Sequence, residues 1–378
     1  MGLAKVEFTI LVIEGDGIGP EVTTEACLVL DQLSALPNGR ASFKQLKRLF
    51  GGCSIDKHGV PVTAEVLEEG RTSNAILMGA TGGPKWDGIR RGVEGCEGGT
   101  TLLRELTDVY ANIRPCEYIS SHVSPLKEEL VQGTKFIVVR ENVSGAFYGP
   151  KVEEPDYASD LWAYKRSEIE RIARMAAHIA LSSASPVPRV ISCDKANVLA
   201  SSRLWRRIAE ETIKREYPQV EIVHQLADSA TTLMMMQPTS FNGVILADNT
   251  FGDILSDLAA VIPGTLGVMP SGCLADLPVK KWGDEPVKGY YEPIHGSAPD
   301  IAGQGIANPV GSILSVAMML RYSFGMEEEA QAIELAVKTT LDAGIKTKDM
   351  RGTSSTREVG DQVRATLKML LEKQGYHS

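Results

Sequence analysis

The stretch Val6–Glu21, VEFTILVIEGDGIGPE, sets the fold class of this 378-residue chain. Its first eight residues are β-branched and apolar, which is typical of a buried strand. A glycine-rich turn follows, and helical periodicity then continues over 21–36. A strand that passes through a tight turn into a helix is the repeating unit of α/β proteins.

The same alternation continues along the chain. Short apolar runs predict strands at 75–78, 136–139 and 189–192, and amphipathic periodicity predicts helices at 168–181, 199–217, 312–324 and 327–343. Glycine and proline predict loops at 82–84, 149–150, 263–264, 270 and 286. We therefore expect helices that cover a largely parallel sheet. Because no linker divides the chain, any two domains should interleave in sequence.

The composition excludes several classes of protein. With 43% hydrophobic and 23% charged residues the chain is an ordinary globular one, and apolar runs such as 243–247 and 312–320 are too short for a membrane span. A net charge of −9 argues against nucleic acid as a partner. Six scattered cysteines without a CxxC pair argue against a disulfide framework and structural zinc. Together with an N-terminus that has no basic leader, they predict a cytoplasmic location.

The glycine cluster Gly15–Gly19 does not match a Rossmann dinucleotide site. Its spacing is G-x-G-x-G followed by proline, and no acidic residue occurs over 32–55, where a ribose-binding carboxylate would belong. A tight strand-to-helix turn is favoured, although its backbone amides could still line a ligand cleft.

Two aspartates lie four residues apart in FGDILSDLAAVIPG. Helical spacing places the carboxylates of Asp253 and Asp257 on one face, where like charges repel unless something compensates them. A divalent cation bound through oxygen would do so. The alternative is that Asp253 lies in the first helical turn, where the helix dipole stabilises an anion.

Three arginines are candidates for binding an anionic substrate: Arg104, Arg114 and Arg140. A guanidinium group binds a carboxylate through two parallel hydrogen bonds, so three of them would suit a substrate with two carboxylates. Each also has an ordinary interpretation as a surface salt bridge, and sequence does not show whether they converge.

Three further residues lie in polar motifs. Lys195, in SCDKANV, follows a strand and would serve as a base if its pKa were depressed by nearby cations. Asp228, in HQLADSA, is a candidate third metal ligand, and otherwise a surface carboxylate. His295, in EPIHGSAPD, either stacks on a base or is simply a loop histidine.

Several long motifs occur in a familiar order: GDGIGPE, GGPKWD, YANIRP, VVREN, DKANVL, HQLADSA, FGDILSD, EPIHGSAPDIAG and GIANP. The chain thereby resembles the β-decarboxylating dehydrogenases, and within them the fungal enzymes that act on 3-isopropylmalate in leucine biosynthesis. The resemblance implies a non-Rossmann, isopropylmalate/isocitrate dehydrogenase-like α/β fold. Residues 1–109 with 264–378 would form a cofactor-binding domain, and 110–263 a substrate and dimerisation domain. It also implies a homodimer with shared active sites.

The resemblance also implies roles for single residues. The substrate carboxylates would be held by the three arginines. Mg²⁺ or Mn²⁺ would be bound by three aspartates, the last from the partner subunit: Asp253, Asp257 and Asp228. Lys195 of the partner would accept the hydroxyl proton. Glu97 would approach the substrate side chain and the nicotinamide. NAD would contact Ile18, Glu292, His295, Gly296, Ser297, Ala298, Asp300 and Asn308, with Asp300 repelling the 2′-phosphate of NADP. The expected reaction is oxidative decarboxylation of 3-isopropylmalate to 4-methyl-2-oxopentanoate.

The chain departs from the family at the expected proton donor. The usual tyrosine precedes Phe-Gly, whereas this chain reads Ala146-Phe147-Tyr148-Gly149. By position the tyrosine is Phe147, which has no proton to give. Tyr148 is the catalytic candidate if the loop shifts by one residue; otherwise water supplies the proton.

The second departure concerns the pocket for the substrate side chain. Two leucines that usually cover the isopropyl group are Thr100 and Thr101 here. Their hydroxyls need partners, and lost methyl groups weaken apolar contact. Another 3-substituted malate therefore stays open as the substrate. The exchanged aromatics leave a second alternative open, a non-catalytic subunit. Glu97 argues against isocitrate, because it would repel a third carboxylate.

Overall fold

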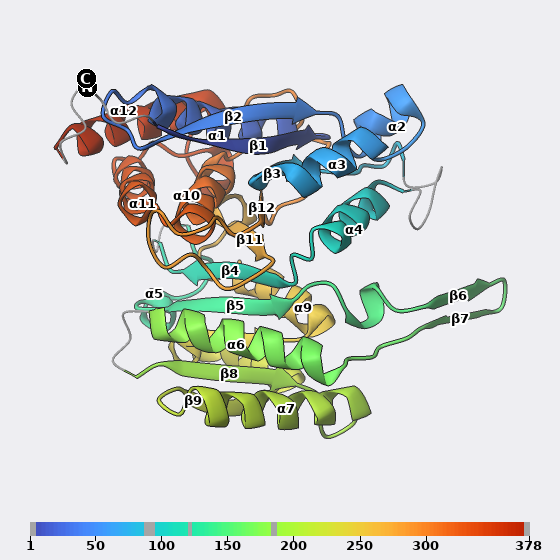
Figure 1. Cartoon of the computed structure of the whole chain (residues 1–378). Coiled ribbons are helices and arrows are strands. Elements are labelled where there is room, and N and C mark those ends of the chain that lie inside the picture. Colours follow the sequence, from blue (N-terminus) through green and yellow to red (C-terminus); the bar gives the residue numbers. More distant parts are fainter. Residues whose placement is uncertain (1–4, 87–94, 120–122, 183–186, 374–378) are drawn as a thin grey trace. The chain divides into compact units, whose positions relative to one another are not determined.

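A computed structural model of the protein describes residues 5–86, 95–119, 123–182 and 187–373 (Figure 1). The chain forms two compact units that interleave in sequence. Unit 1 combines Met1–Asp108 with Thr265–Ser378, and unit 2 is Val109–Gly264. In each unit helices pack against mostly parallel strands, so the predicted α/β class is confirmed.

Unit 1 has five strands among its described residues, in the order β2-β1-β3-β12-β11. All neighbours are parallel except β11 and β12. The apolar run of β1 is buried on both faces, with Ile10 through Ile13 all at 0% exposure, as expected for a central parallel strand. The bounds are β1 Val6–Gly15, β2 Ala41–Arg48, β3 Ala75–Ala80, β11 Pro270–Leu274 and β12 Gly289–Pro293.

The helices of unit 1 form layers over this sheet. Helices α1 and α10 pack against the strands, and α11 and α12 pack outside them. The bounds are α1 Gly19–Ala35, α2 Gly52–His58, α3 Ala64–Thr72, α4 Cys96–Leu106, α10 Val310–Phe324, α11 Glu327–Asp342 and α12 Thr356–Lys373. The loop predicted at Pro270 is wrong, because this proline begins β11 opposite Pro293. Proline is tolerated at the first residue of a strand, where its missing donor costs little.

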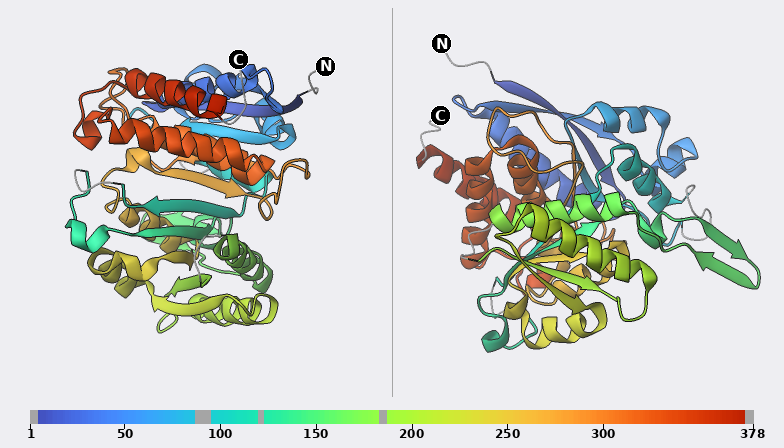
Figure 2. Two further views of the ribbon diagram at one scale, coloured as in Figure 1. Left: turned by 90° about the vertical axis from the view of Figure 1, so that its left-hand side faces the viewer. Right: turned by 60° about the horizontal axis from the view of Figure 1, so that its bottom comes forward.

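The strands of unit 2 run in the order β4-β5-β10-β8-β9, and among them only β4 is antiparallel to its neighbour within the unit. Helices α6 and α7 lie on one face, and α8 and α9 lie on the other (Figures 1 and 2). The strands are β4 Ala111–Glu117, β5 Lys135–Glu141, β8 Arg189–Asp194, β9 Glu221–Leu226 and β10 Gly243–Ala247. The helices are α5 Glu128–Val131, α6 Arg166–Ser182, α7 Ala200–Glu216, α8 Ala227–Met236 and α9 Asn249–Ala259.

A two-stranded hairpin, β6 (Lys151–Glu154) with β7 (Tyr157–Asp160), projects from unit 2 (Figure 1). Its two strands pair only with each other. Apolar side chains on and beside it are exposed, with Val152 at 43%, Tyr157 at 59% and Leu161 at 53%. An isolated hairpin of this kind is marginally stable in water and gains from a covering partner.

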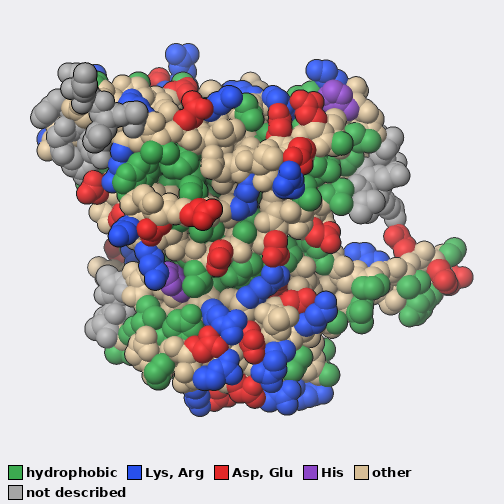
Figure 3. All heavy atoms as spheres, viewed as in Figure 1, with side chains coloured by type: hydrophobic (Ala, Val, Ile, Leu, Met, Phe, Trp, Pro, Cys, Tyr) green, Lys and Arg blue, Asp and Glu red, His purple; other side chains and the backbone are tan. Residues whose placement is uncertain are grey.

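The outer surface of unit 2 is highly charged. Figure 3 shows basic and acidic side chains interleaved over α6 and α7, and these include the pairs of Arg166 with Glu211 and of Arg174 with Glu216. No described helix is both long enough and apolar enough to cross a bilayer.

Candidate active site

The strand register of unit 2 brings several predicted site residues to one edge of the sheet. Ala247 of β10 lies opposite Arg140 of β5 and Cys193 of β8, and Asp194 of β8 lies opposite Leu226 of β9. Lys195 therefore follows β8 where Asp228 follows β9. The carboxyl edge of parallel strands is where α/β proteins bind ligands.

Helix α9 begins immediately after this edge. Its N-cap is Asp248, whose carboxylate accepts a hydrogen bond of 2.8 Å from the backbone amide of Phe251. Burial raises the pKa of Asp248 to about 6. Because α9 starts at Asn249, Asp253 lies beyond the first turn. The explanation of Asp253 as a first-turn dipole residue is therefore wrong; Asp248 takes that place.

The two carboxylates of α9 are compensated by two arginines. Arg140 donates to Asp253, and Nη1 of Arg114 donates to Oδ1 of Asp257 at 3.1 Å and lies 3.7 Å from Oδ1 of Asp253. The arginine side chains are only 4% and 10% exposed, whereas those of Asp253 and Asp257 are 40% and 59% exposed. The carboxylates thus converge on one cationic nitrogen and remain open to a ligand.

Asn249 and Gly252 hold Arg140 in place, and sequence inspection missed both. The Asn249 side-chain oxygen accepts from Nε and Nη2 of Arg140 at 3.0 and 2.6 Å, and its amide donates to the carbonyl of Ser144. A Cβ at Gly252 would lie 2.7 Å from the Arg140 side chain. The glycine in FGD is the signal that could have indicated this close approach.

Lys195 and Asp228 form a second cluster in unit 2. Nζ of Lys195 lies 2.6 Å from Oδ2 of Asp228, and the two side chains are 25% and 62% exposed. The hydrogen bond from Lys195 lowers the pKa of Asp228. In the described part of one chain, no three carboxylates, imidazoles or thiols group closely enough to hold a metal.

Phe147 and Tyr148, the two exchanged aromatic residues, differ in which of them faces Arg140. The Phe147 ring lies beneath this guanidinium, with 5.6 Å between the ring centroid and Cζ. Phe147 ends a single 3-10 turn, η2 (Gly145–Phe147), and Tyr148 follows as its C-cap. The loop therefore presents the residue without a hydroxyl to Arg140.

In unit 1 the third arginine, Arg104, has a different environment. It forms an ion pair with Glu292, a predicted cofactor residue. Its guanidinium also lies 5.2 Å from the ring centroid of Tyr290. Arg104 is thus held by neighbours on β12.

Helix α4 carries Glu97, Thr100, Thr101 and Arg104 at helical spacing. The hydroxyl of Thr101 donates to the carbonyl of Glu97 at 3.1 Å. Thr100 is 6% exposed, and its hydroxyl has no hydrogen-bond partner among the described residues. The predicted side-chain pocket therefore contains one buried, unsatisfied hydroxyl.

The GDGIGPE segment is a tight turn, as favoured above, with Gly15 and Gly17 at φ of +72° and +60°. The backbone amide of Ile18 is used within the fold, since it donates to the carbonyl of Ser297 at 2.8 Å. The buried carboxylate of Asp16, which sequence inspection missed, accepts hydrogen bonds from the amides of Gly52, Cys53 and Gly82.

The predicted adenosine loop, 295–300, joins this turn through Ser297. Ala298 packs against the cluster formed by Ile18, Val22 and Ala307. Burial lowers the pKa of His295, whose Nε2 is buried and makes no hydrogen bond within the described structure. A Cβ added at Gly296 would meet nothing within 4 Å, and Asp300 is exposed. The loop therefore has room beside Gly296, and it carries a buried imidazole nitrogen without a hydrogen-bond partner among the described residues.

Asn308 makes two side-chain hydrogen bonds within the fold. Its side-chain amide donates to Asp349 at 3.0 Å, and its oxygen accepts from the amide of Val310. Both contacts orient the start of α10, so the described partners of Asn308 are structural.

Comparison with known proteins now decides the family. The model of the isocitrate/isopropylmalate dehydrogenase family matches residues 9–363. The chain belongs to the isocitrate/isopropylmalate dehydrogenase family. It is 53% identical to 3-isopropylmalate dehydrogenase B of Aspergillus niger over 95% of this chain and 97% of that one. It is 49% identical to 3-isopropylmalate dehydrogenase of Hapsidospora chrysogena over 97% of this chain and 98% of that one.

Solved structures of isocitrate/isopropylmalate dehydrogenase relatives share the fold. Isocitrate dehydrogenase of Methylococcus capsulatus superposes with a TM-score of 0.81 at 30% identity, covering 96% of this chain and 99% of that one. The apo β-decarboxylating dehydrogenase of Thermococcus kodakarensis gives 0.77 at 35% identity, covering 97% and 98%. The resemblance inferred from the motifs is confirmed.

Proposed function

We propose that the protein is an NAD- and divalent-metal-dependent dehydrogenase that converts 3-isopropylmalate to 4-methyl-2-oxopentanoate and carbon dioxide, the oxidative decarboxylation of leucine biosynthesis. The observation that carries the proposal is the α9 cluster, in which two open carboxylates face two buried arginines. A non-catalytic subunit would have no use for this cluster or for Lys195.

The donor chemistry of the α9 cluster fits a hard dication. Mg²⁺ and Mn²⁺ prefer carboxylate oxygens, and Asp253 and Asp257 converge on one point already. Asp228 of the partner subunit would be the third ligand, since the described residues of one chain bring no three such ligands together. When bound, the dication withdraws electron density from the substrate oxygens and NAD accepts the hydride.

The remaining steps belong to the side chains. Arg104, Arg114 and Arg140 bind the two substrate carboxylates and orient the reacting carbon. Lys195 of the partner subunit accepts the hydroxyl proton through water. After carbon dioxide leaves, an acid protonates the carbon, and Tyr148 is the nearest hydroxyl in sequence to the position held by Phe147. Glu97 would approach the substrate side chain and the nicotinamide.

Unit 1 is the proposed cofactor-binding domain. The adenine would contact His295 and the open backbone at Gly296, and Ile18, Ser297, Ala298 and Asn308 shape that loop. Asp300, which is exposed, would accept the ribose hydroxyls and repel a 2′-phosphate. Glu292 would exchange its contact with Arg104 for the cofactor.

Unit 2 is the proposed substrate and dimerisation domain. The self-paired hairpin β6–β7 exposes Val152 and Tyr157, and α8 and α9 expose Met236 at 60% and Ile254 at 57%. A second copy would cover these apolar groups and complete the site. Six free thiols support a reducing, cytoplasmic compartment.

Purified full-length protein tests this proposal. With 3-isopropylmalate, NAD and Mg²⁺ we expect NADH and carbon dioxide in equal amounts, and EDTA should stop both. Turnover that survives EDTA would contradict the metal site, and a preference for NADP would contradict the role of Asp300. Light scattering measures the dimer.

A further inference from the structure

The loop that carries Lys195 is fixed by its own backbone. The carbonyl of Lys195 accepts hydrogen bonds from the amides of Val198 at 3.0 Å and Leu199 at 2.9 Å. On its other side, Oδ1 of Asp194 accepts from the amide of Ala196 at 2.9 Å. Asp194 is 1% exposed, so this carboxylate is a rigid anchor at the end of β8.

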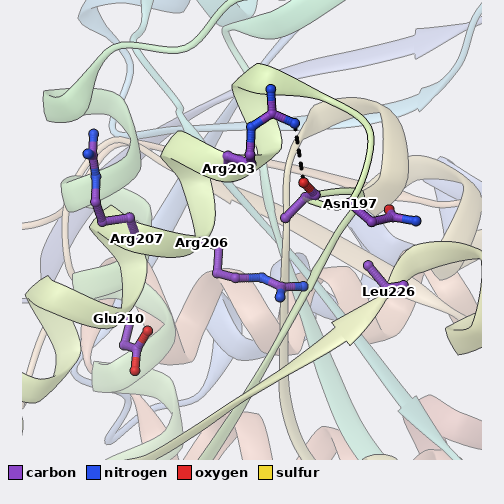
Figure 4. A pocket seen from close by; sticks show the side chains of 7 residues that line it. Asn197, Arg203, Arg206, Arg207, Glu210 and Leu226 are labelled. Atoms are coloured by element: carbon purple, nitrogen blue, oxygen red, sulfur yellow. Dashed lines mark hydrogen bonds between the residues drawn. The ribbon is translucent and has the colours of Figure 1, made fainter.

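Two arginines of α7 hold this loop from behind (Figure 4). Arg206 binds Asp194 through a fork, with Nε to Oδ2 at 2.9 Å and Nη2 to Oδ1 at 2.8 Å. Arg203, one turn earlier, donates to the carbonyls of Val198 at 3.1 Å and Ala196 at 3.4 Å. A bidentate pair fixes the carboxylate in orientation as well as in position.

Asp194 depends on Arg206 for its countercharge. A second basic group, His224, has its Nδ1 3.9 Å from Oδ2 of Asp194. Burial lowers the pKa of His224, which disfavours a charge on this ring. A buried carboxylate without its cation is strongly disfavoured, so the loop would rearrange if Arg206 were lost.

We propose that Arg206 is a positioning residue for Lys195, acting through Asp194 and the amide of Ala196. The inference rests on the proposed function, in which Lys195 takes a proton from the substrate. Displacing a catalytic group by about 1 Å can cost about a hundredfold in rate. Arg206 should therefore affect turnover rather than substrate binding, because the substrate carboxylates are assigned to other arginines: Arg104, Arg114 and Arg140.

The structure offers both a matched control and a route for chemical rescue. A surface groove of about 500 Å³ is lined by Arg203, Arg206, Arg207 and Glu210. The Arg206 side chain is 35% exposed there, so a small cation can reach Asp194 if this side chain is removed. Arg207 is the matched control. Its side chain points away from Arg206 in Figure 4, and its Nε lies 4.0 Å from Oε1 of Glu211.

The experiment compares Arg206→Ala, Arg206→Lys and Arg207→Ala in the full chain. We expect Arg206→Ala to lower kcat about a hundredfold while the KM values for NAD and 3-isopropylmalate change less than about threefold. Arg206→Lys keeps the charge but loses the bidentate hydrogen bonds to Asp194, so its kcat should lie between those of the wild type and Arg206→Ala. Guanidinium at non-denaturing concentration should restore part of the lost kcat, whereas equal sodium chloride should not.

Each outcome decides the inference. If Arg206→Ala matches Arg207→Ala in kcat, or if guanidinium fails to rescue it, the positioning role is wrong. If Arg206→Ala does not fold, Arg206→Lys serves instead, and a folded Lys variant with wild-type kcat overturns the proposal. If the wild-type protein and Arg207→Ala both fail to oxidise 3-isopropylmalate, the proposed function falls, and this inference falls with it.

Discussion

Helices α9 and α4 both carry predicted site residues at helical spacing, but they are built differently. Helix α9 starts with a buried aspartate cap, and its two acidic side chains are matched by arginines. Helix α4 starts at Gly95 without a side-chain cap bond and contains the unsatisfied hydroxyl of Thr100. The two carboxylates of α9 thus have cationic partners, whereas α4 holds a buried hydroxyl without a hydrogen-bond partner among the described residues.

The largest effect is expected from removing either carboxylate of α9. Asp253→Asn or Asp257→Asn should lower kcat/KM at least about a thousandfold, because dication binding contributes several kcal/mol. Calorimetry with Mg²⁺ in the presence of substrate measures the lost binding independently of turnover. Asp342→Asn, which removes an exposed partner of Lys338, is the control. A variant that binds Mg²⁺ normally would contradict the metal site.

The second prediction concerns the cap of α9. Burial raises the pKa of Asp248 from 3.8 to about 6. The folded protein then holds a proton that the unfolded chain releases, so stability falls as pH rises through this range, by about 3 kcal/mol. Asp248→Asn should remove this slope and keep the helix start, since asparagine caps equally well.

Urea unfolding of both proteins between the ordinary and the raised pKa measures this difference in slope. Other acids contribute equally to the two proteins, so the comparison isolates Asp248. If the free energy of unfolding changed with pH equally in wild type and Asp248→Asn, the pKa of Asp248 would not be raised, and this prediction would be wrong.

The comparison also explains what sequence could predict. Strands such as β1 were predictable because burial on both faces requires a continuous apolar run. The site at Asp253 and Asp257 was predictable because two like charges on one helical face need compensation. Asn249, Asp16 and Arg206 were not predictable, since their roles depend on partners 109, 36 and 12 residues away. Pro270 misled because loops and strand starts both accept proline.

The third prediction tests the exchanged aromatics. Tyr148→Phe should slow turnover at least about tenfold if Tyr148 protonates the carbon. In that background Phe147→Tyr should restore the rate, because the Phe147 ring faces Arg140 at 5.6 Å. Phe147→Tyr alone is the matched control for the added hydroxyl. Unchanged turnover of Tyr148→Phe would assign the proton to water.

The smallest effect is expected from replacing the two threonines of α4. Thr100→Leu with Thr101→Leu removes the buried, unsatisfied hydroxyl and adds apolar contact for the isopropyl group. At about 0.8 kcal/mol per buried CH₂, one recovered contact lowers the KM for 3-isopropylmalate about fourfold. Unsubstituted malate, which has no alkyl group to cover, is the internal control and should be unaffected. If the double variant instead binds 3-isopropylmalate less tightly, the threonines are complementary to the native substituent, and the pocket on α4 is as closely fitted as the carboxylates on α9.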